Sequence, residues 1–261
     1  MLIDSNAYIG HWPFLKLEYN TPETLLGRMK EFGTDISVIS NLNGIFYKNT
    51  QHANDELQEA IRSKKIYQDR FIPFAVINPA YGGWRDDLEQ CITRMGMKGI
   101  RLYPQYHGYE IAAPACVELV KRCRDKGLPV AFCLRMVDSR TSSWMDLEKE
   151  WTLKNIVPIV KAVPDAKYLV VNAANSLALN PEEMDLFKKA DLLIDSSGRN
   201  ITNWSDLFKS FGTGSFCFGT HSPILDYFSG LLRIESSRAT ETDEKTKEQL
   251  RSGNLKRMLG I

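Results

Sequence analysis

The sequence lacks paired cysteines, an excess of charge and any long apolar run. Its five cysteines are dispersed and none forms a Cys-x-x-Cys pair, so we expect reduced thiols in a cytoplasmic protein. Lysine and arginine number 33 and aspartate and glutamate 32, which gives no electrostatic reason to expect a nucleic acid or membrane partner. No apolar run approaches the ~20 residues of a transmembrane helix, and no signal peptide is visible.

Several signatures of well-known enzyme classes are also missing. The chain has no Gly-x-Gly-x-x-Gly between a strand and a helix, no P-loop and no Gly-x-Ser-x-Gly elbow, so dinucleotide, nucleotide and serine-hydrolase functions have no support. No linker or low-complexity stretch divides its 261 residues. We therefore expect a single domain over residues 1–261.

Short, largely apolar segments alternate with longer amphipathic ones. Several of the short segments are almost wholly apolar, as strands buried on both faces should be. The expected strands are Leu2–Ser5, Ile36–Ser40, Phe71–Ile77, Gly99–Tyr103, Pro129–Leu134, Tyr168–Val171, Leu192–Asp195 and Phe216–Gly219.

Helix-start signals lie between these strands. Thr21 and Asn180 each precede a proline and an acidic residue, the order of an N-cap, a first-turn proline and a first-turn acid. Eight strands alternating with helices match the count and size of a (β/α)8 TIM barrel, an α/β fold. A doubly wound open sheet shares the alternation and is the alternative.

Six segments, in order, resemble the amidohydrolase-2 type family of metal-dependent hydrolases. Residues 3–10 resemble its first-strand motif, Asp-x-His-x-His-x-Gly. Residues 99–104, 127–133 and 164–172 resemble its fourth, fifth and sixth strands. Residues 216–223 resemble the eighth, usually Phe-Gly-Ser-Asp-x-Pro, and residues 254–260 resemble the closing helix. The resemblance implies an amidohydrolase-like barrel with its active site at the C-terminal strand ends.

The resemblance also implies a divalent metal, such as zinc, held by four histidines and an aspartate. In this chain every one of those positions has changed, and the residues are Asn6, Tyr8, Cys133, Asn172 and His221. Only Cys133 and His221 are competent zinc ligands. We therefore expect no cofactor and no tightly held catalytic metal, although metal at low occupancy is conceivable.

Two residues are the catalytic candidates. His221, where the family has its aspartate, is a candidate general base; the alternative is a partly buried histidine hydrogen-bonded to backbone. Arg101 shares a strand face with Tyr103, and a barrel-lining Arg101 can clamp a substrate carboxylate. The alternative for Arg101 is an ion pair with Asp4 or Asp195.

The remaining changed positions, with their neighbours, are candidates for substrate binding. They are Asn6, Tyr8, Tyr103, Cys133, Arg135, Asn172 and, in the loop after the first strand, His11. For Arg135 a surface loop is the alternative, and for Asn172 an Asx turn. Cys133 is a nucleophile only if a neighbour lowers its pKa; otherwise it is a small packing residue.

Two functions of different classes follow. The first is an amidohydrolase-like hydrolase that acts, without the usual metal, on a small carboxylated or hydroxylated compound through a lactone, C–N or C–C bond. The second is a non-catalytic subunit that binds a small ligand or a partner on a degenerate barrel. A homo-oligomer is compatible with either function.

Overall fold

The structure is a computed structural model, and it describes residues 1–137, 143–147, 151–173, 177–198, 201 and 203–261. Eight strands follow one another around a barrel in chain order, and each pairs in parallel with the next. The strands are β1 (Ile3–Ile9), β2 (Ile36–Asn41), β3 (Phe71–Val76), β4 (Gly99–Leu102), β5 (Pro129–Cys133), β6 (Lys167–Val171), β7 (Asp191–Asp195) and β8 (Phe216–Cys217).

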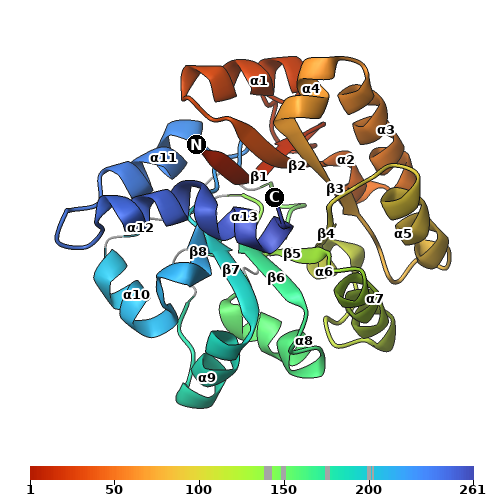
Figure 1. The fold of residues 1–261 in the computed structure, drawn as a ribbon. Helices are drawn as coiled ribbons and strands as arrows, with labels where there is room; N and C mark the ends of the chain where they lie inside the picture. The colour runs from red at the N-terminus through yellow and green to blue at the C-terminus, as the bar shows by residue number, and fades with distance from the viewer. Residues whose placement is uncertain (138–142, 148–150, 174–176, 199–200, 202) are drawn as a thin grey trace.

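Helices surround the strands, as Figure 1 shows. They are α1 (Pro22–Glu31), α2 (Asn43–Phe46), α3 (Gln51–Arg62), α4 (Lys65–Arg70), α5 (Trp84–Thr93), α6 (Pro104–His107), α7 (Pro114–Asp125), α8 (Val157–Ala162), α9 (Pro181–Lys189), α10 (Trp204–Phe211), α11 (Tyr227–Glu235), α12 (Glu244–Glu248) and α13 (Asn254–Leu259). Short 3-10 turns cover Leu153–Ile156 and Thr213–Ser215, and a π-helical turn covers Gln249–Gly253. None of the described helices is long and apolar enough to cross a membrane.

The barrel closes between β1 and the segment that follows β8. The Ser5 amide donates to Phe218 O at 2.9 Å, the His221 amide donates to Asn6 O at 2.7 Å, and Ala7 forms a parallel bridge with Ser222. This closure, together with the sequential strand order, confirms the (β/α)8 barrel over the open-sheet alternative.

The first strand is longer than the sequence pattern predicts. The pattern ends it at Ser5, but the strand continues to Ile9, with a register irregularity between Asp4 and Ala7. Ser5 and Asn6 look like a strand end because they are polar, yet both are fully buried. The Ser5 hydroxyl donates to Phe218 O at 2.7 Å, so the closing contact satisfies it.

The helix caps follow the sequence signals. Thr21 accepts a hydrogen bond from the Thr24 amide, and Asn180 accepts one from the Glu183 amide. Each cap satisfies an amide that has no partner within its helix.

Alternation along the strands separates two apolar cores. Ile100 and Leu102 pack in the larger cluster with the outer helices, whereas Ala131, Leu169 and Leu193 belong to a second cluster inside the barrel. Since successive strand residues point to opposite faces, Arg101 points into the barrel. α13 lies over the end where strands begin, because Lys167, the first residue of β6, donates to Met258 O. The candidate residues lie at the other end.

Candidate functional site

Asn6 is the centre of the buried polar network. Its Oδ1 accepts a hydrogen bond from Arg101 Nη1 at 2.9 Å. Its Nδ2 lies 2.8 Å from Asp195 Oδ2, 2.9 Å from His221 Nδ1 and 3.2 Å from Ser197 Oγ. Asn6 therefore joins β1 to β4, to β7 and to the segment after β8.

His221 follows β8, is fully buried and has a positive φ of 60°. Its Nδ1 faces the Asn6 amide at 2.9 Å, so Nδ1 accepts and Nε2 donates to Met136 O at 2.8 Å. Burial lowers the pKa of His221 to about 3. The ring is therefore neutral at pH 7, and both of its nitrogens are engaged; this is the backbone-bonded alternative to a general base.

Arg101 extends from β4 into the barrel and is fully buried. Beyond the bond from Nη1 to Asn6, its Cζ lies 4.4 Å from the centre of the Tyr8 ring, within cation–π distance. Its Nε and Nη2 have no hydrogen-bond partner among the described residues, so it forms no direct ion pair with Asp4 or Asp195. The guanidinium is thus held at one end by Asn6, and its Nε–Nη2 edge is buried.

The hydroxyls of Tyr8 and Tyr103 lie beside this guanidinium. Within the described part of the chain both are buried without a hydrogen-bond partner, although Arg101 is near enough to act on the pKa of each phenol. Burial outweighs that influence and raises both pKa values, so both phenols stay protonated. The structure thereby brings together the three residues that strand alternation and the first-strand motif single out.

Cys133 ends β5 and Asn172 follows β6, and both contact Arg135. Burial raises the pKa of Cys133 to about 12, and the thiol donates to Arg135 O at 3.0 Å. Asn172 Nδ2 donates to the same oxygen at 2.5 Å, and its Oδ1 lies 3.5 Å from Arg135 Nη2. The thiol is protonated at neutral pH, and the Asn172 side chain holds the backbone of the loop after β5.

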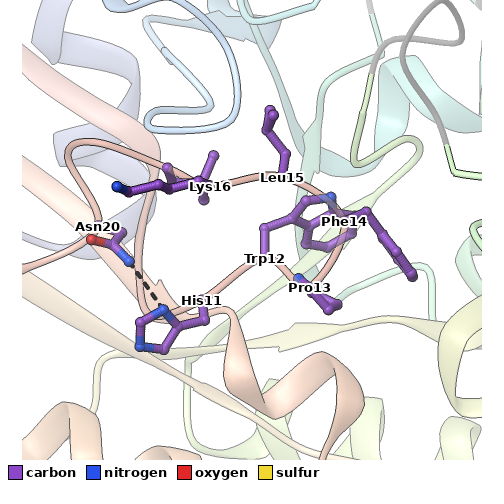
Figure 2. A pocket seen from close by; sticks show the side chains of 8 residues that line it. His11, Trp12, Pro13, Phe14, Leu15, Lys16 and Asn20 are labelled. Atoms are coloured by element: carbon purple, nitrogen blue, oxygen red, sulfur yellow. Dashed lines mark hydrogen bonds between the residues drawn. The ribbon is translucent and has the colours of Figure 1, made fainter.

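The structure separates His11 from this network. His11 is exposed in the loop after β1, where its Nδ1 lies 3.3 Å from Asn20 Nδ2. Figure 2 shows the surface pocket that this loop forms, with His11 and Asn20 at one side and Trp12 and Phe14 at the other. Its volume is about 510 Å³.

Trp12 separates that surface loop from the interior. It is 4% exposed and packs edge-on against Phe14, Phe46 and Tyr106, at centroid distances of 5.6, 5.2 and 6.0 Å. Trp12 also belongs to the interior cluster that contains Tyr8 and Tyr103. An aromatic cover therefore shields the buried network from water.

Sequence reasoning gives Asp195 little weight and misses Ser197. Asp195 accepts from Ser197 Oγ at 2.7 Å and from the Asn172 amide at 2.8 Å, and it is fully surrounded by protein, which raises its pKa. Asp4 is enclosed likewise by the Thr220 hydroxyl at 2.6 Å, and burial raises its pKa to about 6. The sequence feature that could have pointed to Ser197 is the polar segment Ser-Ser-Gly directly after an apolar strand.

The residues present do not fit the family's metal. Asn6 Oδ1 already accepts a hydrogen bond from Arg101, and both ring nitrogens of His221 are already hydrogen-bonded within the protein. In the described ranges, no three His, Cys, Asp or Glu side chains are grouped so that they could hold an ion. The buried positive charge of Arg101, hydrogen-bonded to Asn6, would also repel a divalent ion at these positions.

Solved structures share the fold at low sequence identity. 2,6-Dihydroxybenzoate decarboxylase from Rhizobium is 15% identical, with a TM-score of 0.71 over 99% of this chain and 98% of that chain. A putative amidohydrolase from Staphylococcus aureus is 15% identical (TM-score 0.74, 100% and 99%). 5-Carboxyvanillate decarboxylase from Sphingomonas paucimobilis is 13% identical (TM-score 0.72, 100% and 99%). These likenesses establish the fold alone.

The sequence matches no curated protein. A family model described as amidohydrolase matches residues 4–261. Since that match spans nearly the whole chain, the protein belongs to the amidohydrolase family.

Proposed function

We propose that this protein binds a small carboxylated compound inside the barrel, without the family's metal and with Arg101 as the anion-binding residue. The observation that carries the proposal is the buried edge formed by Nε and Nη2 of Arg101, which has no partner among the described residues. Those two N–H groups are parallel, and a carboxylate accepts from both at once. Leaving a buried donor unpaired costs about 1–3 kcal/mol, and more when it is charged, so a ligand that pairs this edge is favoured.

The neighbouring hydroxyls extend the proposal to a hydroxylated carboxylate. The buried Tyr8 and Tyr103 hydroxyls, unpartnered in the described ranges, can donate to, or accept from, a ligand hydroxyl. Two structural neighbours support this choice, because the compounds in their names, 2,6-dihydroxybenzoate and 5-carboxyvanillate, each combine a carboxylate with at least one ring hydroxyl.

The second proposed function is turnover of that compound, by hydrolysis of a lactone, C–N or C–C bond, and membership of the amidohydrolase family favours it. The site geometry favours binding alone. His221 would have to break one of its two hydrogen bonds to act as a base, and its pKa of about 3 makes it a weak one. Cys133, with a pKa of about 12, offers no thiolate.

Calorimetric titration with 2,6-dihydroxybenzoate, in excess chelator, tests the proposal. Resorcinol, which lacks the carboxylate, is the matched neutral probe. Charged hydrogen bonds contribute about 1.5–3 kcal/mol each, so we expect Arg101→Lys to weaken binding by about 10- to 100-fold. Exposed Arg62 is the control, and Arg62→Lys should change nothing. Equal binding of the two probes would show that Arg101 does not recognise the carboxylate.

Product analysis of the same mixtures separates the two functions. Binding without a product, in both wild type and His221→Gln, supports the binding protein. A product that forms in chelator and disappears in His221→Gln supports the enzyme.

A further inference from the structure

We infer that the guanidinium of Arg101 is a built-in cation that takes the place of the divalent metal in this barrel. Arg101 is the charged group against which the former ligand positions are arranged. Its Nη1 lies 2.9 Å from Asn6 Oδ1, and its Cζ lies 4.4 Å from the centre of the Tyr8 ring. These two positions are the ones where the first-strand motif carries its paired histidines.

Two further positions feel the same charge. Arg101 opposes the rise that burial causes in the pKa of Cys133, and it adds to the fall that burial causes in the pKa of His221. Both effects are those expected of a nearby positive charge. Asn172, the fifth position, instead binds the backbone of Arg135. Asn6 and Tyr8 therefore contact the Arg101 guanidinium, and Cys133 and His221 lie within the range of its charge.

The network also supplies a negative charge, which reaches Arg101 through Asn6 and not by direct contact. Asn6 accepts from Arg101 through Oδ1 and donates to Asp195 Oδ2 at 2.8 Å through Nδ2. An amide thereby links the cation to a buried carboxylate without a direct ion pair. Asp195 is itself held by Ser197 and Asn172, so it is not free to move onto Arg101.

A guanidinium can provide some of the functions of a metal ion but not all of them. A guanidinium attracts and orients an anion along an unpaired N–H edge, as a metal does at a vacant coordination position. It has only N–H donors and no acceptor, so it does not bind water as a ligand or lower its pKa as a metal ion does. The site keeps electrostatic binding and gives up metal-activated water.

Zinc binding by two designed variants tests the inference, and no carboxylate ligand is needed. One variant restores histidines on β1, Asn6→His with Tyr8→His, and keeps Arg101; the other adds Arg101→Ala. Competition of zinc chloride with a chromogenic chelator should show at least about tenfold tighter binding once the repelling charge is gone. Equal zinc affinity of the two variants would overturn the inference.

Guanidinium rescue gives a second measurement that needs no redesign of β1. Arg101→Ala should have a lower Tm, and guanidinium chloride at low millimolar concentration should restore at least half of the loss, whereas equal sodium chloride should not. If Arg101→Ala does not fold, refolding from urea with and without guanidinium replaces the Tm. If guanidinium has no specific effect, the inference is contradicted, even when the histidine variants do not fold. Whether Arg101 binds a carboxylate is decided separately, by the calorimetric titration.

Discussion

Removing the Asn6 side chain should destabilise the protein more than any ordinary surface truncation. Asn6→Ala leaves Arg101 Nη1 and His221 Nδ1 without their partners, and both residues are fully buried. Asp195 keeps the bonds from Ser197 and the Asn172 amide, so it adds little to the loss. Two orphaned buried groups at about 1–3 kcal/mol each give a loss of about 2–6 kcal/mol.

Urea unfolding followed by circular dichroism measures this loss as a change in the free energy of unfolding. For a domain of about this size, 1 kcal/mol corresponds to roughly 2–4 °C in Tm, so a loss near 4 kcal/mol lowers Tm by about 10 °C. Half-buried Asn20 makes one long side-chain contact with His11, at 3.3 Å. Asn20→Ala is therefore the matched control, with an expected change within about 0.5 kcal/mol.

An Asn6→Ala loss below about 1 kcal/mol would refute the reasoning. It would mean that Arg101 and His221 find other partners at no cost. A large loss with an unchanged urea m-value would support the hydrogen-bond network around Asn6. An unchanged m-value means that the variant exposes the same surface on unfolding as the wild type.

The other predictions concern pH and backbone packing. His221, with a folded pKa of about 3 against an ordinary 6.5, contributes stability that is lost as pH falls from about 6.5 to 3, by about 5 kcal/mol at most. Asp4 has a folded pKa of about 6 against 3.8, so its contribution is complete below about 3.8 and is lost as pH rises through 6, by about 3 kcal/mol. Asp4→Asn should therefore make the acid loss of stability steeper between pH 6 and 4, as measured by urea unfolding at each pH. Gly230→Ala places a Cβ 2.7 Å from Gly219 O and should cost at least about 2 kcal/mol, whereas Gly27→Ala, with open space around it, should stabilise α1 by about 0.5–1 kcal/mol.

Equal pH profiles for wild type and Asp4→Asn would show that the Asp4 carboxyl is not held protonated by burial. A Gly230→Ala protein as stable as wild type would show that α11 can move away from the segment after β8.

The barrel can be read from the chain because its signals are local. Apolar runs of strand length, alternating with capped helices, recur eight times, and the period of two along Gly99–Tyr103 is sufficient to place Arg101 and Tyr103 on one face. The replacement of all five ligand positions is likewise a fact of the residue order. Local pattern misplaces the end of β1, since Ser5 and Asn6 are polar and their partners come from residues 195–221.

The sequence by itself thus determined the fold, the shared strand face of Arg101 and Tyr103, and the change at every ligand position. Only the tertiary structure decided what those side chains do. The side-chain partners of Asn6 lie 95, 189, 191 and 215 residues away, and no local periodicity encodes contacts of that range. The pKa of His221 depends on complete burial and on the Met136 carbonyl, which residue type does not reveal. Barrel closure brings these groups together, engages both His221 nitrogens in hydrogen bonds and buries the Nε–Nη2 edge of Arg101, while His11 stays exposed.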